Sequence, residues 1–169
     1  CPKRPLEILK NLVVIVGAGP SGIFTAIELI RCKSSKKIVI VEKGKAIEKR
    51  HCPKTKTKQC VNCKPNCHIT TGFSGAGAFS DGKLYSQIKD PRFFGRKVMH
   101  EFVEAGAPEE ILSAAHPHIG TFKLVRVVEA MREKIVALGG EIRFQHQVVG
   151  AHTEPEGEGL RLTGLRVRA

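Results

Sequence analysis

A glycine loop between an apolar strand and an apolar helix constrains the fold of this chain more than any other feature. The β-branched run over residues 12–16 leads directly into a G-x-G-x-x-G pattern that begins at Gly17. A second β-branched run follows the helix and ends at Glu42, 20 residues after Gly22. Strand, glycine loop, helix and acid at this spacing are typical of a dinucleotide-binding βαβ unit. The alternative is a glycine-rich turn that holds no ligand.

Each position of the loop has a physical reason in that interpretation. Gly17 allows the tight turn out of the strand, Gly19 lets the backbone approach a pyrophosphate, and Gly22 lets the helix pack closely on the sheet. The first turn of the helix, at Pro20 and Ser21, offers backbone N–H groups and the positive end of the helix dipole to the phosphates. Glu42 accepts hydrogen bonds from ribose hydroxyls and disfavours a 2′-phosphate.

The remaining periodicity predicts an α/β chain with a Rossmann-like doubly wound parallel sheet and a small β-hairpin or meander. Thr121 is the expected cap of the last helix, and residues 154–159 are the expected turn before the final strand pair. The predicted strands are 12–17, 37–42, 141–144 and 147–151, and the predicted helices are 21–32, 93–105, 109–115 and 121–138. We expect a tail at 1–10 and one incomplete domain over 11–169.

A second glycine-rich segment lies in the long irregular stretch between residues 44 and 90. Residues 71–85 contain four glycines and several small polar residues, which let a backbone lie flat against a planar ligand. Lys83 is placed to stabilise negative charge on such a ligand. The alternative is a flexible glycine-rich surface loop.

These motifs together resemble the FAD-dependent dehydrogenases called NAD(FAD)-utilising dehydrogenases, within the glutathione-reductase-like group of flavoproteins. The resemblance rests on V-I-V-G-A-G-P-S-G, V-E-K-G, G-A-G-A-F-S-D-G-K-L and G-A-P-E-E-I, and it covers residues 10–153. It implies that the chain is an N-terminal FAD-binding portion, with a backbone contact to adenine near Val148. The FAD-binding residues that it implies are Gly17, Gly19, Pro20, Ser21, Gly22, Glu42, Lys43, Gly75, Gly77, Ser80, Asp81, Gly82, Lys83 and Val148.

Four cysteines occupy the basic, Cys-rich loop at 44–70, called here the basic loop. Cys52, Cys60, Cys63 and Cys67 are spaced so that their thiolates could hold zinc or an iron–sulfur cluster. A redox-active thiol pair and unliganded reduced cysteines are the other two interpretations. Because the chain shows no export signal, reduced thiols and a cytoplasmic location are expected.

Positive charge is concentrated in the same region. The chain carries a net charge of +12, and residues 31–68 contain 12 Lys and Arg against only Glu42 and Glu48. This surface suits an anionic partner such as nucleic acid or an acidic protein, but it also fits an ordinary solvated loop. With one Tyr and no Trp, the chain offers little for base stacking. The apolar runs are too short for a membrane span.

The sequence therefore predicts the FAD-binding portion of a flavin-dependent oxidoreductase, with NAD(P)H as a candidate electron donor and an unidentified acceptor. This portion alone is expected to be unable to complete a reaction. A nucleotide-bound module that binds nucleic acid or a protein through the basic loop is the alternative function. No catalytic residue can be assigned; His116 and His118 fit either proton transfer or a surface turn.

Overall fold

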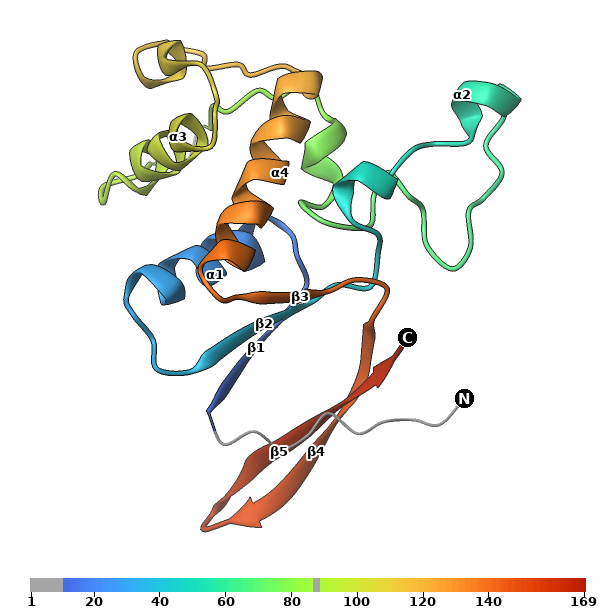
Figure 1. The fold of residues 1–169 in the computed structure, drawn as a ribbon, viewed down its shortest axis with the longest axis vertical. Coiled ribbons are helices and arrows are strands. Elements are labelled where there is room, and N and C mark those ends of the chain that lie inside the picture. Colours follow the sequence, from blue (N-terminus) through green and yellow to red (C-terminus); the bar gives the residue numbers. More distant parts are fainter. Residues whose placement is uncertain (1–10, 87–88) are drawn as a thin grey trace.

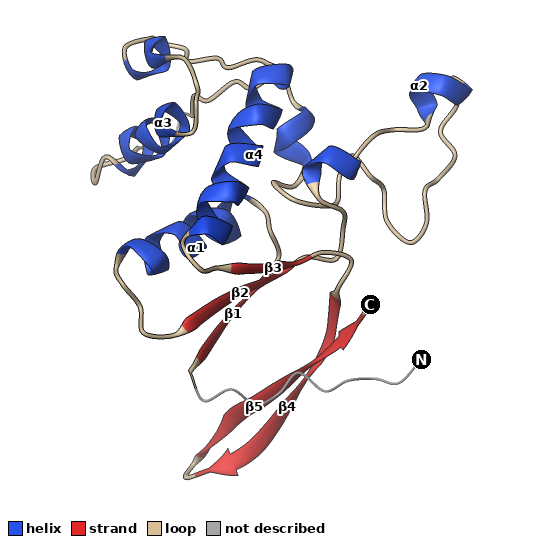
Figure 2. Cartoon of the chain, in the orientation of Figure 1, coloured by secondary structure: helices blue, strands red, loops and turns tan. Residues whose placement is uncertain are grey.

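The computed structural model describes residues 11–86 and 89–169, so the predicted tail at 1–10 lies outside the described residues. The strands are β1 (Leu12–Val16), β2 (Lys37–Val41), β3 (Glu141–Arg143), β4 (Gln147–Glu156) and β5 (Gly159–Arg168). The α-helices are α1 (Pro20–Arg31), α2 (Lys54–Thr57), α3 (Phe94–Glu104) and α4 (Thr121–Ala137). Three 3₁₀ turns occur at η1 (Ile47–Lys49), η2 (Ala76–Phe79) and η3 (Glu109–Leu112). Figures 1 and 2 show their arrangement.

The central element of the fold is a three-stranded parallel sheet in the order β1-β2-β3. Leu12 pairs with Lys37 between β1 and β2, and Val39 pairs with Glu141 between β2 and β3. Residues 38–41 of the central strand are all buried, as expected for a β-branched run in a parallel sheet. The predicted α/β class and the first βαβ unit are thus confirmed.

The main core lies between the sheet and two helices, α1 and α4, on one of its faces (Figure 1). Ile38 and Ile40 of β2 point into this core, where they meet α1 and the buried stripe of α4. Val39 and Val41 alternate to the other face and are buried outside this cluster. Within the part of the chain that the structure describes, both covering helices lie on the same face, so the doubly wound arrangement stays a prediction.

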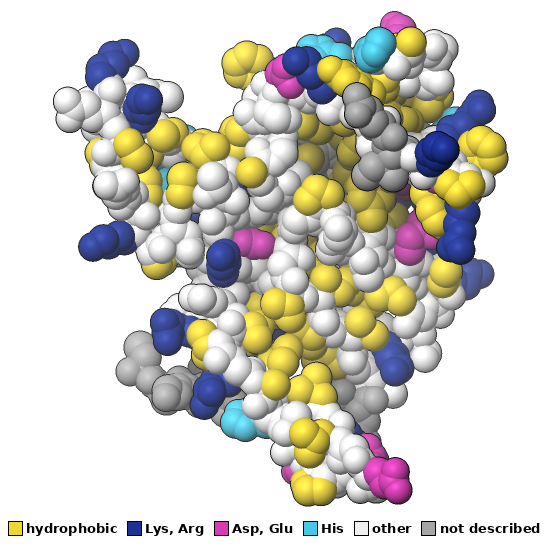
Figure 3. Space-filling view, turned by 180° about the vertical axis from the view of Figure 1, so that it is seen from behind, with side chains coloured by type: hydrophobic (Ala, Val, Ile, Leu, Met, Phe, Trp, Pro, Cys, Tyr) yellow, Lys and Arg dark blue, Asp and Glu magenta, His cyan; other side chains and the backbone are white. Residues whose placement is uncertain are grey.

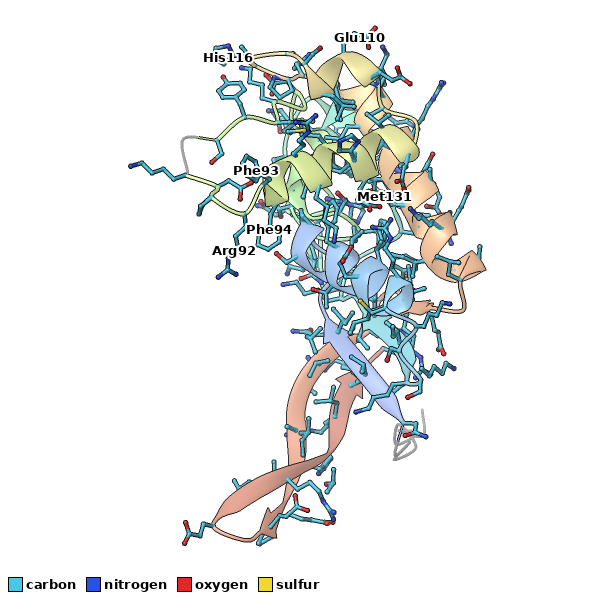
Figure 4. All side chains as sticks on the ribbon, turned by 90° about the vertical axis from the view of Figure 1, so that its left-hand side faces the viewer. Arg92, Phe93, Phe94, Glu110, His116 and Met131 are labelled. Carbon is cyan, nitrogen blue, oxygen red and sulfur yellow. The ribbon has the colours of Figure 1, made fainter. Side chains whose placement is uncertain are left out.

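Strands β4 and β5 form an antiparallel hairpin that is separate from the parallel sheet and projects away from it (Figures 1 and 4). The expected hairpin is confirmed, and its turn lies inside the expected range 154–159 but is limited to residues 157–158, because β4 continues to Glu156 and β5 begins at Gly159. Arg161 of β5 pairs with both Glu154 and Glu156, so these acids lie on a strand. The tip of the hairpin carries acidic and apolar side chains, and Leu160 is 72% exposed (Figure 3).

Two local predictions were also wrong. The segment predicted as a helix over 109–115 is only the 3₁₀ turn η3, because the His116-Pro117 pair soon afterwards disfavours helical backbone. Thr121 does not cap α4; Gly120, with φ of +85°, takes that position, and the Thr121 hydroxyl donates to the Ser80 carbonyl instead.

The apolar face of each long helix is covered along its middle and exposed at one end. On α3, Phe94 is 57% exposed, and Figure 4 shows it beside Phe93 at the outer start of that helix. On α4, the stripe is buried from Leu124 to Ile135, whereas Leu138 lies beyond the last turn and is exposed. Among the described residues, no helix is both long and apolar enough to cross a membrane.

Candidate functional site

The first glycine loop, residues 17–22, connects β1 to α1 at the carboxyl end of the sheet. Gly17 has φ of +99°, and its N–H donates to the Val41 carbonyl across the sheet at 2.8 Å. A Cβ on Gly22 would lie 2.1 Å from the Gly17 carbonyl oxygen, which no side chain tolerates. A Cβ on Gly19 would meet nothing within 4 Å. The turn and packing roles predicted for Gly17 and Gly22 are confirmed, and the space above Gly19 is open.

The N-terminus of α1 faces the same open space. Gly19 is the N-cap in an extended conformation, no side chain caps the helix, and Pro20 occupies its start. The first turn contains no acidic residue that would compete for the N–H groups. A 12-residue helix that begins in this way can bind an anion through its backbone and its dipole.

Glu42 is 5% exposed, and its side chain links the first glycine loop to the segment that follows β2. Its Oε2 accepts a hydrogen bond from the Ala18 N–H at 2.8 Å, and its Oε1 accepts one from the Gly44 N–H at 2.7 Å. Each carboxylate oxygen can accept more than one hydrogen bond, so both retain capacity for ribose hydroxyls. These two bonds give the acid a structural role even without a ligand.

The second glycine loop, residues 71–83, lies directly against the first. The Ser74 N–H donates to the Ala18 carbonyl at 2.6 Å, and a Cβ on Gly75 would be 3.8 Å from the Pro20 ring. Phe73 is fully buried beneath this contact. The structure thus joins two motifs that are more than 50 residues apart in the sequence.

The end of the second glycine loop pairs with the segment before α4. The Ile119 N–H donates to the Gly82 carbonyl at 3.0 Å, and a Cβ on Gly82 would lie 2.8 Å from the Gly120 nitrogen. Lys83 forms a 3.0 Å ion pair with Asp81, with both side chains 58% exposed. The Lys83 hydrogen bond lowers the pKa of Asp81, and the same contact raises the pKa of Lys83. Lys83 was predicted to present positive charge to a planar ligand, and Asp81 partly offsets that charge.

Of the two histidines considered for proton transfer, His118 pairs by backbone with Lys83, and His116 packs its ring edge-on against Tyr85 at 4.9 Å. Tyr85 and His116 are exposed. Nothing among the described residues orients either imidazole for catalysis, so proton transfer by these residues stays a prediction.

A largely apolar cavity of about 150 Å³ opens beside the two glycine loops, between α1, α3 and α4. Its rim includes five of the predicted cofactor-binding residues, Pro20, Gly77, Ser80, Gly82 and Lys83. Its floor consists of apolar side chains from the three helices, namely Ile23, Phe24, Phe102, Leu124, Val128 and Met131. An apolar pocket with a few polar groups at its rim is the usual form of a small-molecule site.

A second cavity, of about 190 Å³ and lined by basic residues, lies on the other side of Glu42. It is lined by Lys43, Gly44, Gln145, Gln147 and Arg168, among others. The His146 N–H donates to the Glu42 carbonyl at 3.0 Å, which places this segment beside the end of β2. Val148 does not line the cavity; it pairs with Val167 in the hairpin, one position beyond Gln147.

The four cysteines of the basic loop line one cavity of about 290 Å³ but do not form a metal site. All five described cysteines, which include Cys32 elsewhere, are free thiols. Within residues 11–86 and 89–169, no group of three or more His, Cys, Asp or Glu side chains is arranged to hold a metal ion. The zinc or iron–sulfur prediction therefore finds no support in the arrangement of these residues.

Arg50 is a structural residue that the sequence analysis did not identify. Its side chain is 3% exposed and donates to the carbonyls of His68 at 2.9 Å, Phe73 and Ile69. Its guanidinium carbon lies 4.7 Å from the centre of the Phe79 ring. Burial lowers the pKa of Arg50. Arg50 thus ties the basic loop to the second glycine loop, and no local pattern distinguishes it from the other cations in that stretch.

No family model matches the chain. An uncharacterised protein of Clostridium beijerinckii is 39% identical over 146 residues, which are 86% of this chain and 27% of that protein. The structure resembles THI4 of Thermovibrio ammonificans, with a TM-score of 0.54, 16% identity, and coverage of 94% of this chain and 47% of THI4. It also resembles L-amino acid deaminase of Proteus myxofaciens, with a TM-score of 0.52, 14% identity, and coverage of 96% and 44%.

The similarity to the two solved structures shows a shared fold. The chain spans about a quarter of the curated relative and just under half of the solved structures that it matches.

Proposed function

We propose that this chain is the FAD-binding portion of a flavin-dependent oxidoreductase. The observation that carries the proposal is the contact between the two glycine loops, in which Ser74 bonds to Ala18 while the space above Gly19 stays open. A glycine-rich surface loop would not need this contact. The fold similarity supports the proposal independently of the loop geometry.

The residues present fit the ADP half of FAD. The first turn of α1, at Pro20, Ser21 and Gly22, would hold the pyrophosphate on uncapped backbone N–H groups. Glu42 would accept the ribose hydroxyls with the capacity left on its two oxygens. Lys43 and the segment from Gln145 to Val148 would lie on the adenine side, next to the basic cavity.

We assign the flavin half to the side of the second glycine loop where the apolar cavity opens. Gly75, Gly77, Ser80 and Gly82 of the second glycine loop would present backbone groups to the edge of a planar ring, and the helices would exclude water beneath it. The pair of Asp81 and Lys83 at the rim would set the local charge. Bound FAD would supply hydride and electron transfer, while these residues bind and orient it.

The electron donor, the electron acceptor and the cellular location complete the proposal. We propose NAD(P)H as electron donor and a small molecule or protein as acceptor, with the residues that contact them outside this chain. We also propose a cytoplasmic location, where the cysteines would stay reduced. This chain by itself would bind the cofactor without completing a reaction.

A ligand series tests the proposal on the full-length protein. FAD, FMN and ADP are titrated separately, with flavin fluorescence for the first two and competition against FAD for ADP. Because the glycine fingerprint holds the ADP half, FAD should bind at least about 100-fold more tightly than FMN, and ADP should displace it. Equal affinity for FAD and FMN, or no binding of either, would refute the assignment.

Binding of an anionic partner through the basic loop is a second candidate function. None of the lysines from Lys43 to Lys64 forms an ion pair with another described residue, and the single acid among residues 44–70, Glu48, is paired with Arg132. These charges remain free for an acidic protein or nucleic acid. Affinity for RNA or DNA that falls steeply with salt would support nucleic-acid binding, and negligible, salt-insensitive affinity would exclude it.

A further inference from the structure

The basic cavity beyond Glu42 is built from three segments that are far apart in the sequence. Residues 43–45 follow β2, residues between 64 and 71 come from the end of the basic loop, and residues 145, 147 and 168 lie at or just before the open end of the hairpin. Figure 1 places the end of β5, marked C, below the basic loop. The cavity is therefore a product of the fold, and no local sequence motif marks it.

Backbone hydrogen bonds hold the segment after β2 from both sides. The Gln145 N–H donates to the Gly44 carbonyl at 2.9 Å, and the Phe73 N–H donates to the Lys45 carbonyl at 3.1 Å. Lys45 also forms an isolated parallel bridge with Gly72. Because the backbone of this wall is fixed by the fold, a ligand that enters the cavity does not have to order it.

The side chains of the cavity are positively charged and have no internal counter-charge. Three lysines and one arginine line it, namely Lys43, Lys45, Lys64 and Arg168. Among the described residues, none of these four forms an ion pair, and no Asp or Glu side chain lines the cavity. The neutral lining residues add amide and hydroxyl donors, from Asn66, Thr71, Gln145 and Gln147. A hollow lined by cations of one sign concentrates anions, because its walls focus the field.

The size and the lining of the cavity favour a compact anion. Its volume of about 190 Å³ is below the roughly 300 Å³ at which pockets for whole drug-sized ligands begin. No Phe, Tyr or Trp lines it, so a nucleic-acid base has no ring to stack on. A phosphoryl group carries up to about two negative charges and three strong acceptor oxygens in a small volume. It therefore matches both the cations and the neutral donors of this cavity.

We propose that the basic cavity binds a phosphoryl group, supplied by inorganic pyrophosphate or by a small phosphate ester. The site is separate from the pyrophosphate site at the start of α1, because the Glu42 carboxylate lies between the Ala18 N–H of the first glycine loop and the Gly44 N–H of the cavity wall. The FAD assigned above would approach this cavity with its adenine, which is uncharged, so the cations stay unpaired when FAD is bound. The proposal itself does not rest on FAD binding.

Isothermal titration calorimetry on the full-length protein tests the site, in phosphate-free buffer with about 150 mM sodium chloride to screen long-range charge effects. Pyrophosphate and ribose 5-phosphate, titrated separately, distinguish the inorganic source from the ester. At least one of them should bind with a Kd tighter than about 1 mM. Absence of binding for both would overturn the proposal, and so would single-stranded DNA binding through the same lysines when neither small phosphate binds.

Two double variants with the same change in net charge locate the site. Lys45→Gln/Lys64→Gln should weaken binding at least about tenfold, since it removes two of the lining cations. Lys54→Gln/Lys56→Gln, on the exposed helix α2 outside the cavity, should leave the affinity within about twofold. Equal losses in the two variants would show that overall charge, and not the cavity, attracts the anion.

A competition experiment separates this site from the cofactor site. The affinity for the phosphate ligand should be the same with and without saturating FAD. Displacement of pyrophosphate by FAD would assign the anion to the cofactor site and overturn the proposal. Unchanged affinity in Lys45→Gln/Lys64→Gln, with melting temperatures showing that the variant is folded, would do the same.

Discussion

Two glycines in the same loop are required for different reasons. Gly22 is fixed by packing, because the position of its missing Cβ lies 2.1 Å from a backbone oxygen. Gly19 has an ordinary φ of −72° and empty space around its Cα, so the folded chain alone does not require glycine there. What would require glycine at position 19 is a ligand that approaches the backbone. Substitutions at Gly22 and at Gly19 therefore test folding and ligand binding separately.

Gly22→Ala should destabilise the fold. The added methyl group cannot avoid the Gly17 carbonyl, so α1 must shift from β1, at a cost of about 1–3 kcal/mol. Thermal or urea unfolding measures the change. An unfolding curve identical to that of the wild type would show that the loop is looser than the structure indicates.

Gly19→Ala should leave folding nearly intact and weaken FAD binding. Loss of glycine at an N-cap changes stability by less than about 1 kcal/mol, whereas the methyl group enters the space assigned to the pyrophosphate. FAD titration of this variant, set beside its unfolding curve, gives both quantities. Unchanged FAD affinity would place the cofactor elsewhere.

Among single residues, the sequence identified those whose role depends on neighbours that are close in the chain. The glycine spacing predicted the turn at Gly17 and the close packing at Gly22. The bond between Glu42 and the Ala18 N–H, the buried Arg50 and the Thr121 bond to Ser80 all depend on segments brought together by folding. No window of sequence contains both partners of those contacts, so sequence patterns could not predict them.

Among the elements, long periodic segments were predicted well and short or charged ones poorly. The parallel strands β1, β2 and β3 and the long helix α4 lie within a few residues of their predicted bounds. The 3₁₀ turns at 47–49 and 76–79 lie in a stretch predicted as irregular, because turns of three or four residues have no repeat to detect. Glu154 and Glu156 were predicted to lie in a turn. They belong to the end of β4 instead, where both pair with Arg161 of β5.

Arg50 should act as the connector between the basic loop and the second glycine loop. Arg50→Met removes hydrogen bonds to three carbonyls and should lower the free energy of unfolding by about 2–3 kcal/mol. Hydrogen exchange should speed up over residues 51–73, with Lys49→Met as the exposed control. If exchange over this segment stays as slow as in the wild type, Arg50 is not the connector.

The helices α1, α3 and α4 are joined by ion pairs, which predict an acid-sensitive contact. Lys97 lowers the pKa of Glu28, and Lys134 lowers the pKa of Glu104. Because these pKa values are depressed in the folded state, their stabilisation is present above the usual glutamate pKa near 4.5 and is lost as pH falls through the lower folded values. Both carboxylates are more than one-third exposed, so the effect is small.

A series of melting temperatures between pH 7 and pH 3 measures this contribution. The double variant Glu28→Gln/Glu104→Gln should lose less stability than the wild type as the pH falls below about 4.5. Glu133→Gln, an exposed change on α4 at a residue with no ion pair among those described, should follow the wild-type curve. Parallel curves for the wild type and the double variant would show that the ion pairs contribute nothing measurable.

For the whole molecule, the sequence predicted an α/β lobe, and the parallel sheet β1-β2-β3 with its helices confirms that class. The separation of the β4–β5 hairpin from the parallel sheet was only partly foreseen, because strand patterns do not state which strands pair. The two glycine loops, the apolar cavity and the basic cavity beyond Glu42 lie at one end of the sheet. That arrangement suits one extended cofactor.

The most direct test is the absorbance spectrum of the full-length protein after purification and desalting. We expect flavin absorbance at about one FAD per chain, released on denaturation and identified as FAD rather than FMN. Gly19→Ala, purified in the same way, should retain little of this absorbance while remaining folded. A folded wild-type protein that carries no flavin and takes up none when FAD is added would contradict the central claim.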